Sequence, residues 1–226
     1  MINSLTGRVN ALWPEWDRAV TTVEALPPNS ERAIFYRERK SHVGISAFSK
    51  LKALKALQVN QGFLEEIGEL KSLEYLELHM VTAEDLSPIA QLNNLRTIKA
   101  SGLRKAKRFE PLLSSPLLRR LFIEDIKHLS SLEFLATAED LVAIGIEGSL
   151  WKTQRLQSLK PLAALPNLEC LFLTSTALED KDLSYLSRCP KLRILECSRF
   201  ASRSEFMRLR RLMPNLQCTW CDRYEV

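Results

Sequence analysis

A pair of cysteines spaced for metal chemistry lies near the end of the chain, in the sequence Cys218-Thr219-Trp220-Cys221. Thiolates at this spacing are zinc ligands in many proteins, but a zinc site needs four converging ligands. If the segment is a strand, residues three apart face opposite sides of it, so we expect Cys221 in the core and Cys218 outside it. The pair alone therefore predicts no metal site.

The three histidines, His42, His79 and His128, are the other candidates for acid–base chemistry. His128 follows Glu124 and Asp125 closely, yet a catalytic triad or dyad also needs a positioned nucleophile and an oxyanion site. The seven glycines form no phosphate-binding loop of the P-loop or dinucleotide type. We expect no catalysis, no cofactor and no metal, and we interpret His79 as a contact residue.

The elements that position these side chains come from a repeat. Leucine-type residues recur at the first, fourth and sixth positions of eight segments, whose first residues are 19, 22, 23, 23, 27, 24 and 24 residues apart. The fourth and sixth residues share one face of a strand, and stacked repeats place these strands side by side in a parallel sheet. A period in the twenties indicates a solenoid, in which each unit buries its apolar face against its neighbours. The segments are Leu54–Val59, Leu73–Leu78, Leu95–Ala100, Leu118–Ile123, Leu141–Ile146, Leu168–Leu173, Leu192–Cys197 and Leu216–Cys221.

The return half of each repeat has helical spacing. Leu86, Ile89 and Ala90 are one example, and Leu183, Leu186 and Ser187 are another. We expect short helices in these segments, because apolar residues three and four apart share one side of a helix. Their predicted N-caps are Asp85, Asp182 and Ser204.

This pattern resembles the leucine-rich repeat family and is most similar to its internalin-like bacterial type, for which the sequence of residues 86–95 is typical. The resemblance covers nearly the whole chain. It implies an α/β solenoid with a curved parallel sheet on the concave face and short helices and turns on the convex face. The family often has Asn or Cys three residues after the sixth position, where this chain has residues such as Val81, Leu103 and Ile126. We therefore expect a less regular arc.

Both ends of such a solenoid need covers. Residues 1–32 have apolar side chains at helical spacing, including Leu12, Trp13 and Trp16, which predicts a helical N-terminal cap; a helix that binds a partner is the alternative. Residues 33–212 would hold the repeats, with Ala33–Tyr36 as an extra first strand, and residues 213–226 the last repeat and the C-terminal cap. We expect one domain over residues 1–226.

A binding site is expected on the concave sheet. The third, fifth and seventh positions of each segment point away from the core, and exposed aromatic residues beside charges are typical of protein interfaces. A site on an edge, or an aromatic side chain that only covers a cap, is the alternative. The predicted protein-binding residues are Tyr75, Glu77, His79, Lys99, Arg120, Phe122, Glu124, Phe172, Glu196 and Trp220.

Basic residues form a rival site. The net charge is +5, but residues 96–120 hold eight basic residues and one acidic residue. Basic residues that follow the third, fifth and seventh strands leave the sheet on one edge, where they would attract nucleic acid or another anionic surface with a steep salt dependence. A merely solvated loop edge is the alternative, favoured by Glu179, Asp180 and Asp182 on the same edge. The residues of this basic edge are Arg104, Lys105, Lys107, Arg108, Lys152, Arg155, Arg199 and Arg203.

The sequence thus predicts a non-catalytic scaffold that binds another protein, as an inhibitor such as an immunity protein or as an adaptor. No apolar run reaches the roughly 18 residues of a membrane helix, and the first residues show no secretory signal. We therefore expect a cytoplasmic protein without a membrane partner, whose five cysteines are reduced thiols. The identity of the partner and the oligomeric state stay open.

Overall fold

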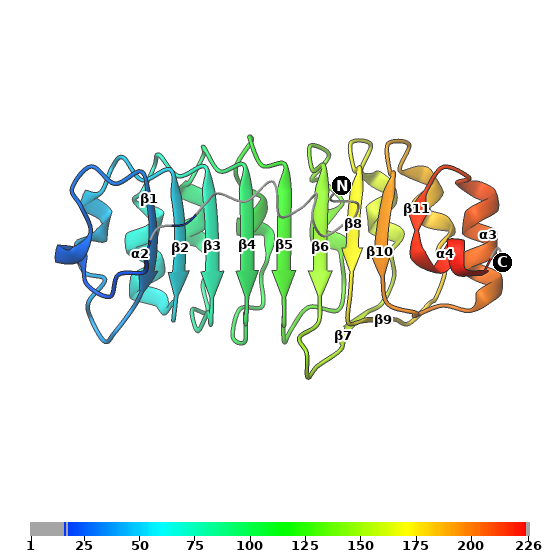
Figure 1. Ribbon diagram of the computed structural model, residues 1–226, viewed down its shortest axis with the longest axis horizontal. Coiled ribbons are helices and arrows are strands. Elements are labelled where there is room, and N and C mark those ends of the chain that lie inside the picture. Colours follow the sequence, from blue (N-terminus) through cyan, green and yellow to red (C-terminus); the bar gives the residue numbers. More distant parts are fainter. Residues whose placement is uncertain (1–15, 17, 225–226) are drawn as a thin grey trace.

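Nine parallel strands form one sheet in the computed structural model, which describes residue 16 and residues 18–224. Each repeat adds its strand beside the previous one, in the order β1-β2-β3-β4-β5-β6-β8-β10-β11 (Figure 1). The extra first strand predicted over Ala33–Tyr36 is confirmed as part of β1. The strands are β1 (Arg32–Tyr36), β2 (Ala53–Leu57), β3 (Tyr75–His79), β4 (Thr97–Ser101), β5 (Arg120–Glu124), β6 (Ala143–Glu147), β8 (Cys170–Leu173), β10 (Ile194–Cys197) and β11 (Gln217–Cys218).

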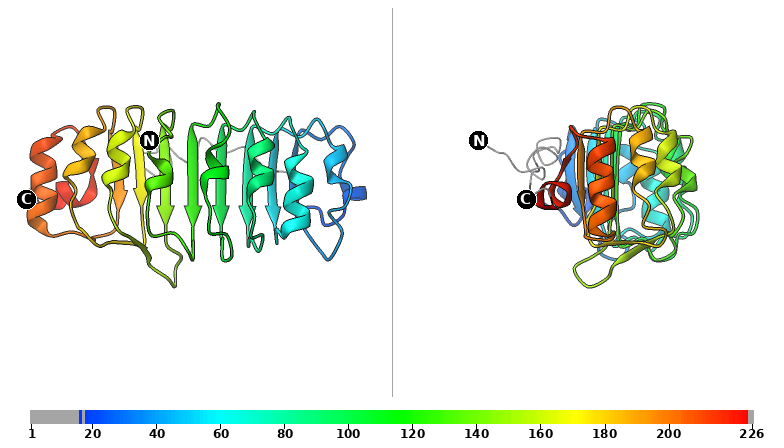
Figure 2. Two further views of the ribbon diagram at one scale, coloured as in Figure 1. Left: turned by 180° about the vertical axis from the view of Figure 1, so that it is seen from behind. Right: turned by 90° about the vertical axis from the view of Figure 1, so that its right-hand side faces the viewer.

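Short helices cover one face of this sheet (Figure 2), and we call the opposite face the sheet face. Most return segments are single 3₁₀ turns, and three of these turns, η3, η4 and η6, have a proline at their first or second position. Proline is pre-organised for a helix start, and 3₁₀ geometry is favoured only over a few residues. The turns are η1 (Val23–Ala25), η2 (Ile45–Ala47), η3 (Ser87–Gln91), η4 (Glu110–Leu113), η5 (Glu133–Leu135), η6 (Lys160–Ala164) and η7 (Ser184–Arg188). The α-helices are α2 (Gln61–Gly68), α3 (Arg203–Leu212) and α4 (Thr219–Tyr224).

The predicted helix caps are corrected in part. Asp85 and Asp182 accept hydrogen bonds from the backbone N–H groups of Ser87 and Ser184 at 2.9 and 2.8 Å, so they close turns that precede η3 and η7. The N-cap of α3 is Ser202, which accepts from the N–H of Glu205 at 3.2 Å, and not Ser204.

One apolar core fills the space between the sheet and the helices. The fourth and sixth positions of the repeat supply it, as with Leu76 and Leu78 of β3, which are fully buried. Val81, Leu103 and Ile126 are buried as well, at the position where the family often has Asn or Cys. In these three repeats apolar packing therefore replaces a hydrogen-bonded side chain, whereas Thr176 at the same position donates to the backbone oxygen of Ile146 at 3.0 Å.

The end repeats differ from the predicted register. Leu54 pairs with Leu76, which makes Leu51, also fully buried, the anchor of its repeat. The sequence was ambiguous here because Leu51, Leu54 and Leu57 all lie three apart. As a result, Ala53, Lys55 and Leu57 occupy the sheet face, where Ala56, Gln58 and Asn60 were predicted.

In the last repeat Cys218 pairs with Leu195 of the core column, one residue earlier than expected, and α4 begins directly after it. Cys218 and Cys221 are both buried, so the prediction that Cys218 lies outside the core is wrong.

Backbone torsions close the turn after many of the strands. The residue that follows β2, β3, β4 or β5 has a left-handed conformation, with φ of 58° at Gln58, 52° at Met80, 71° at Gly102 and 52° at Asp125. Ser175, two residues after β8, has a φ of 49°. Only glycine adopts this region without a steric cost. A column of left-handed residues therefore runs along the edge at which the strands end, and we call it the turn column.

Separate structures flank the two ends of the main sheet. Around the C-terminus, Phe206 of α3 packs against Trp220 and Tyr224 of α4, with ring centroids 6.4 and 6.1 Å apart. Half of the residues of the predicted helical N-terminal cap, 1–15 and 17, lie outside the described residues. In the described half, over residues 18–32, Val20 forms a β-bridge with Phe35 of β1 and the 3₁₀ turn η1 follows, so no α-helix is present there. No helix in the described part of the chain is long and apolar enough to cross a membrane.

Candidate functional site

Nine of the ten predicted protein-binding residues lie on the sheet face, in three rows that cross the strands. One row holds Glu77, Lys99, Phe122, Gly145, Phe172 and Glu196, each opposite the next in the register. A second row holds Tyr75, Thr97 and Arg120, and a third holds Ser101, Glu124 and Glu147 beside His79. Because the register is fixed by the core columns, the repeat spacing alone brings these side chains together.

Trp220 is the exception. It belongs to α4, and its indole Nε1 donates a hydrogen bond to the backbone oxygen of Cys197 at 2.8 Å. Arg223 lies 5.1 Å over its ring. This residue therefore builds the C-terminal cap, because α4 begins where a further strand residue was predicted.

A buried carboxylate is the centre of the sheet face near β3. Glu77 is 3% exposed, accepts a hydrogen bond from the hydroxyl of Tyr75 at 3.1 Å and contacts Nε2 of His79 at 2.6 Å. Its carboxylate also lies 3.2 Å from Nζ of Lys55 and 3.6 Å from Nζ of Lys99. Burial alone would raise the pKa of Glu77, but the His79 hydrogen bond and the two lysine charges lower it to about 2. Lys55 was missed because the first repeat was read three residues out of register.

The same cluster contains a chain of hydroxyl, imidazole and carboxylate groups. Nδ1 of His79 lies 2.7 Å from Oγ of Ser101, while its Nε2 contacts Glu77. Such an order suits a nucleophile, a base and an orienting group, but acyl transfer also needs N–H donors for the oxyanion. The neighbouring N–H of Gly102 donates to the backbone oxygen of Glu124 at 2.9 Å. The geometry fits a network that fixes charges on the sheet face.

A second apolar cluster lies on the sheet face, separate from the core. The rings of Phe122 and Phe172 are 6.1 Å apart by their centroids, with Ala143 and Ile194 beside them. Gly145 lies between them in the row, and a Cβ atom there would approach Cδ1 of Phe122 to 2.6 Å. The missing side chain therefore lets the two rings meet across β6.

The predicted exposure of these aromatic residues is wrong. Phe122 is 9% exposed, Phe172 is 6% and Tyr75 is 7%. The two phenylalanines pack against one another, and the ring of Trp16 lies edge-on to that of Tyr75 at 5.6 Å. Large side chains on neighbouring strands fill the spaces between them, so a position that faces away from the core need not be exposed.

Charges of opposite sign flank the second apolar cluster. Lys55, Lys99 and Arg120 lie toward the N-terminal end of the sheet. Glu147 lies opposite Glu124, and it accepts a hydrogen bond from the hydroxyl of Thr174 at 2.5 Å. Burial, together with the charges of Glu124 and Glu196, raises the pKa of Glu147 despite this hydrogen bond. The sheet face thus has Lys55 and Lys99 around the buried carboxylate of Glu77, an apolar cluster, and a group of carboxylates made by Glu124, Glu147 and Glu196.

The predicted basic edge is divided by the structure. Arg199 and Arg203 stack on Tyr224 of the C-terminal cap, with their guanidinium carbons 5.8 and 5.7 Å from its ring centre. Of the other six residues, five lie exposed on the loops that follow β4 and β6, and Arg155 lies exposed in β7 (Gln154–Leu156). Asp125 is between them, 3.8 Å from Arg104 and 4.0 Å from Lys152.

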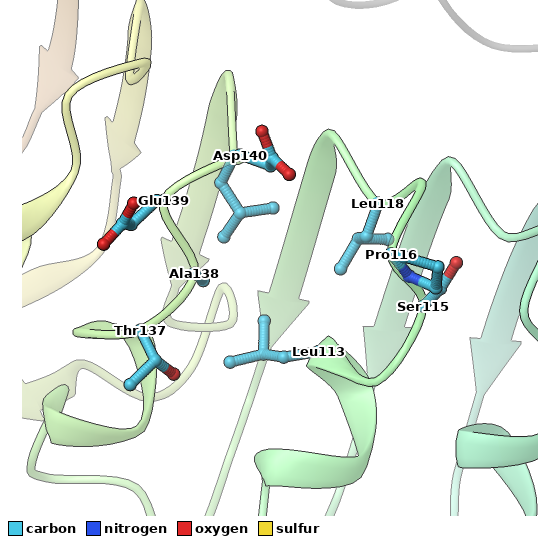
Figure 3. A pocket seen from close by; sticks show the side chains of 9 residues that line it. Leu113, Ser115, Pro116, Leu118, Thr137, Ala138, Glu139 and Asp140 are labelled. Atoms are coloured by element: carbon cyan, nitrogen blue, oxygen red, sulfur yellow. The ribbon is translucent and has the colours of Figure 1, made fainter.

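Three hollows are notable in the described part of the surface. The one in Figure 3 measures about 300 Å³ and lies between the turns that precede β5 and β6, with Leu113, Leu118 and Asp140 in its lining. It contains none of the predicted site residues. The other two lie at the edge where the strands end: one of about 410 Å³ includes Met80 and Glu124, and one of about 640 Å³ includes Trp151 and Lys152.

Metal ligands do not gather in the described residues, where no group of three or more His, Cys, Asp or Glu side chains is arranged to hold an ion. The thiols of Cys197, Cys218 and Cys221 interact with one another, and the contact with Cys218, together with burial, raises the pKa values of Cys197 and Cys221. The same contacts lower the pKa of Cys218. The raised pKa values keep Cys197 and Cys221 neutral, so these two thiols act as apolar groups.

Comparisons with known proteins identify the fold. No protein-family model matches the sequence, and no curated protein matches it either. Among solved structures, the chain is similar to internalin C2 of Listeria monocytogenes, with a TM-score of 0.52, 20% identity, and coverage of 81% of this chain and 71% of that one. For the TLR13–ssRNA13 complex these values are 0.58, 19%, 84% and 28%, and for the Toll–Spatzle complex of Drosophila 0.54, 15%, 74% and 23%.

The chain spans about half of the internalin F chain from Listeria monocytogenes, at 49%, and about a quarter of the two receptor chains. The protein therefore has a leucine-rich repeat fold of the internalin-like type.

Proposed function

We propose that this protein is a non-catalytic scaffold that binds another protein through its sheet face. The observation that carries the proposal is the apolar cluster of Phe122, Ala143, Phe172 and Ile194 between charges of opposite sign. Protein interfaces commonly have an apolar centre with a polar rim, and charge complementarity sets their orientation. The matching partner presents an apolar group and, beside it, basic groups that face Glu124, Glu147 and Glu196.

Two roles suit a scaffold of this size: an inhibitor, such as an immunity protein, and an adaptor. Structural neighbours support protein binding in general, since Toll was solved with Spatzle and the receptor RGFR1 with the peptide hormone RGF2. The fold alone does not choose between the two roles.

Charge reversal at the rim tests the proposal without disturbing the apolar cluster. The variant Glu124→Lys/Glu196→Lys alters the acidic side of the sheet face, where both side chains are partly exposed. Its matched control is Glu110→Lys/Glu133→Lys, which makes the same charge change on the exposed turns η4 and η5. Phe122→Glu and Phe172→Glu are unsuitable, because charges at these buried positions would unfold the cluster.

We expect affinity capture from source-cell lysate, at moderate salt and with nuclease, to recover a protein with the wild type and the control but not with the sheet-face variant. Recovery of the same protein by the sheet-face variant would contradict the proposal. A protein that is recovered only when nuclease is left out would favour the alternative, nucleic-acid binding by the basic edge. TLR13 was solved with single-stranded RNA, and here Arg104, Lys127 and Lys152 surround one hollow.

The proposal that the protein is not an enzyme has its own test, directed at Ser101 beside His79. A fluorophosphonate probe labels serines activated as nucleophiles, and we expect it to leave the native protein unlabelled. Labelling at Ser101 that is lost in His79→Ala would overturn this part of the proposal.

A further inference from the structure

The insertion in the 27-residue repeat forms a projecting loop with an apolar tip. Leu150 and Trp151 are each 94% exposed, the largest exposed fractions among the large apolar side chains described. The loop extends beyond the edge at which the strands end (Figure 1). Two adjacent apolar side chains so fully in water indicate a surface that becomes buried against something else.

Backbone pairing fixes the stem of this loop. Ser149 and Lys152 form an antiparallel bridge, with N–H to oxygen distances of 2.9 and 3.4 Å, so Leu150 and Trp151 are the two residues at the tip of a tight turn. Below it, β7 (Gln154–Leu156) pairs with β9 (Thr176–Leu178) in a separate two-stranded sheet.

Two residues at the base fix the loop further. The side chain of Gln154 is buried, donates to the backbone oxygen of Leu129 at 2.6 Å and accepts from the N–H of Ile126 at 3.2 Å. Gly148 packs so closely that a Cβ atom would lie 2.2 Å from the backbone oxygen of Ser175. The tip is thus held out by a rigid base, and its exposure does not follow from a poorly packed loop.

Cations surround the base of the tip. Arg104, Lys127 and Lys152 line the same hollow as Trp151. The side chains of Arg104 and Lys152 are 75% and 56% exposed, and the only acid in the lining of this hollow is Asp125. Lys105, Lys107 and Arg108 on the loop after β4, and Arg155 in β7, add positive charge along this edge. Two of them have acidic neighbours, since Glu84 lies 3.1 Å from Lys105 and Glu110 lies 3.9 Å from Arg108.

We propose that this tip and the cations around it bind an anionic lipid surface, with Leu150 and Trp151 inserted at the level of the headgroups. Tryptophan favours the interface between water and acyl chains, and lysine and arginine near the surface are attracted by anionic lipids. A base-stacking role would use the tryptophan but leaves Leu150 without a contact. A convex tip with cations behind it suits a soft, flat, negatively charged surface.

Vesicle flotation tests the proposal, with phosphatidylcholine vesicles and with vesicles that also contain phosphatidylserine. We expect the native protein to bind only the anionic vesicles, less tightly as salt is raised, with a blue shift of tryptophan emission. The variant Leu150→Ser/Trp151→Ser should lose about tenfold or more in binding, since each side chain loses its transfer out of water. It should keep the native circular dichroism spectrum and melting temperature, because both positions are exposed.

The matched control is Val43→Ser/Leu212→Ser, which removes two exposed apolar side chains elsewhere and should bind anionic vesicles as the wild type does. Failure of the wild type to float with anionic vesicles would overturn the proposal, as would equal binding by the tip variant. Tip-dependent binding of a single-stranded oligonucleotide, without vesicle binding, would also overturn it and assign the tip to nucleic acid. None of these outcomes affects the sheet-face proposal, whose variants lie on β5, β10, η4 and η5.

Discussion

Replacing Glu77 by glutamine should destabilise the protein at neutral pH and have little effect in acid. The carboxylate is 3% exposed, and its lysine partners Lys55 and Lys99 have side chains that are 28% and 22% exposed, so water screens these pairs weakly. Glutamine has the same shape and can still accept from Tyr75, but it removes the negative charge. The comparison therefore isolates the ionisation of one group.

The expected loss of unfolding free energy follows from the pKa of Glu77. In the folded protein the pKa of Glu77 is about 2, compared with an ordinary value of 4.5. One pKa unit corresponds to about 1.4 kcal/mol, so the ionised group contributes about 3 kcal/mol to the free energy of unfolding at neutral pH. Because the folded pKa lies below the unfolded one, this stabilisation is complete above the unfolded value and is lost as the pH falls toward 2.

Urea unfolding followed by circular dichroism, repeated from neutral pH down to about pH 3, measures this difference. We expect the gap between wild type and Glu77→Gln to narrow steadily on acidification. The control Glu74→Gln changes an exposed carboxylate just before β3, and it should stay close to the wild type throughout. A gap that is independent of pH, or a Glu77→Gln protein more stable than the wild type at neutral pH, would refute the reasoning.

Three further changes probe other parts of the fold. Glu147→Gln should raise the melting temperature at neutral pH but not in acid, because burial raises the pKa of Glu147 and its ionisation then costs stability as the pH rises; the melting temperature against pH checks the sign. Leu171→Ala should cost about 2–5 kcal/mol in denaturant unfolding, because the side chain is fully buried, whereas Leu150→Ala should cost less than about 0.5 kcal/mol. Gly145→Ala should cost about 1–3 kcal/mol, since its Cβ atom meets the ring of Phe122, and Phe122→Leu should reduce that cost; additive effects in the double variant would contradict the contact.

Much of the architecture was predictable from the spacing of apolar residues. Positions such as Leu76 and Leu78 had to share one face, which predicted the strands, the parallel sheet and the side on which Glu77 and Phe122 lie. The prediction failed where the pattern is degenerate, as around Leu51, Leu54 and Leu57, or where the chain leaves it, as at Cys218. Because the first repeat was predicted out of register, Lys55 was not included in the candidate site.

Exposure on the sheet face was harder to predict than the register. The contact between Phe122 and Phe172 depends on a glycine in the strand between them, and the burial of Tyr75 involves Trp16, which lies far outside its repeat. Such contacts depend on the shape of side chains across strands, which alternation does not encode. The exposed tip at Leu150 and Trp151 was signalled only by the length of its repeat.

In the turn column, the path of the backbone depends on a torsion angle, while the side chains form part of the surface. At Gln58, Met80, Asp125 and Ser175 the path of the backbone is set by a torsion angle, and none of these side chains belongs to the buried core. Each of these repeats therefore has one rim position, beside the sheet face, whose side chain can be replaced without a change in the core. Substitutions at these positions change the surface of the rim one repeat at a time. A glycine there would remove the side chain and stabilise the fold by about 1 kcal/mol, because it adopts the left-handed conformation without a steric cost. A solenoid built in this way can acquire new partners by small independent steps.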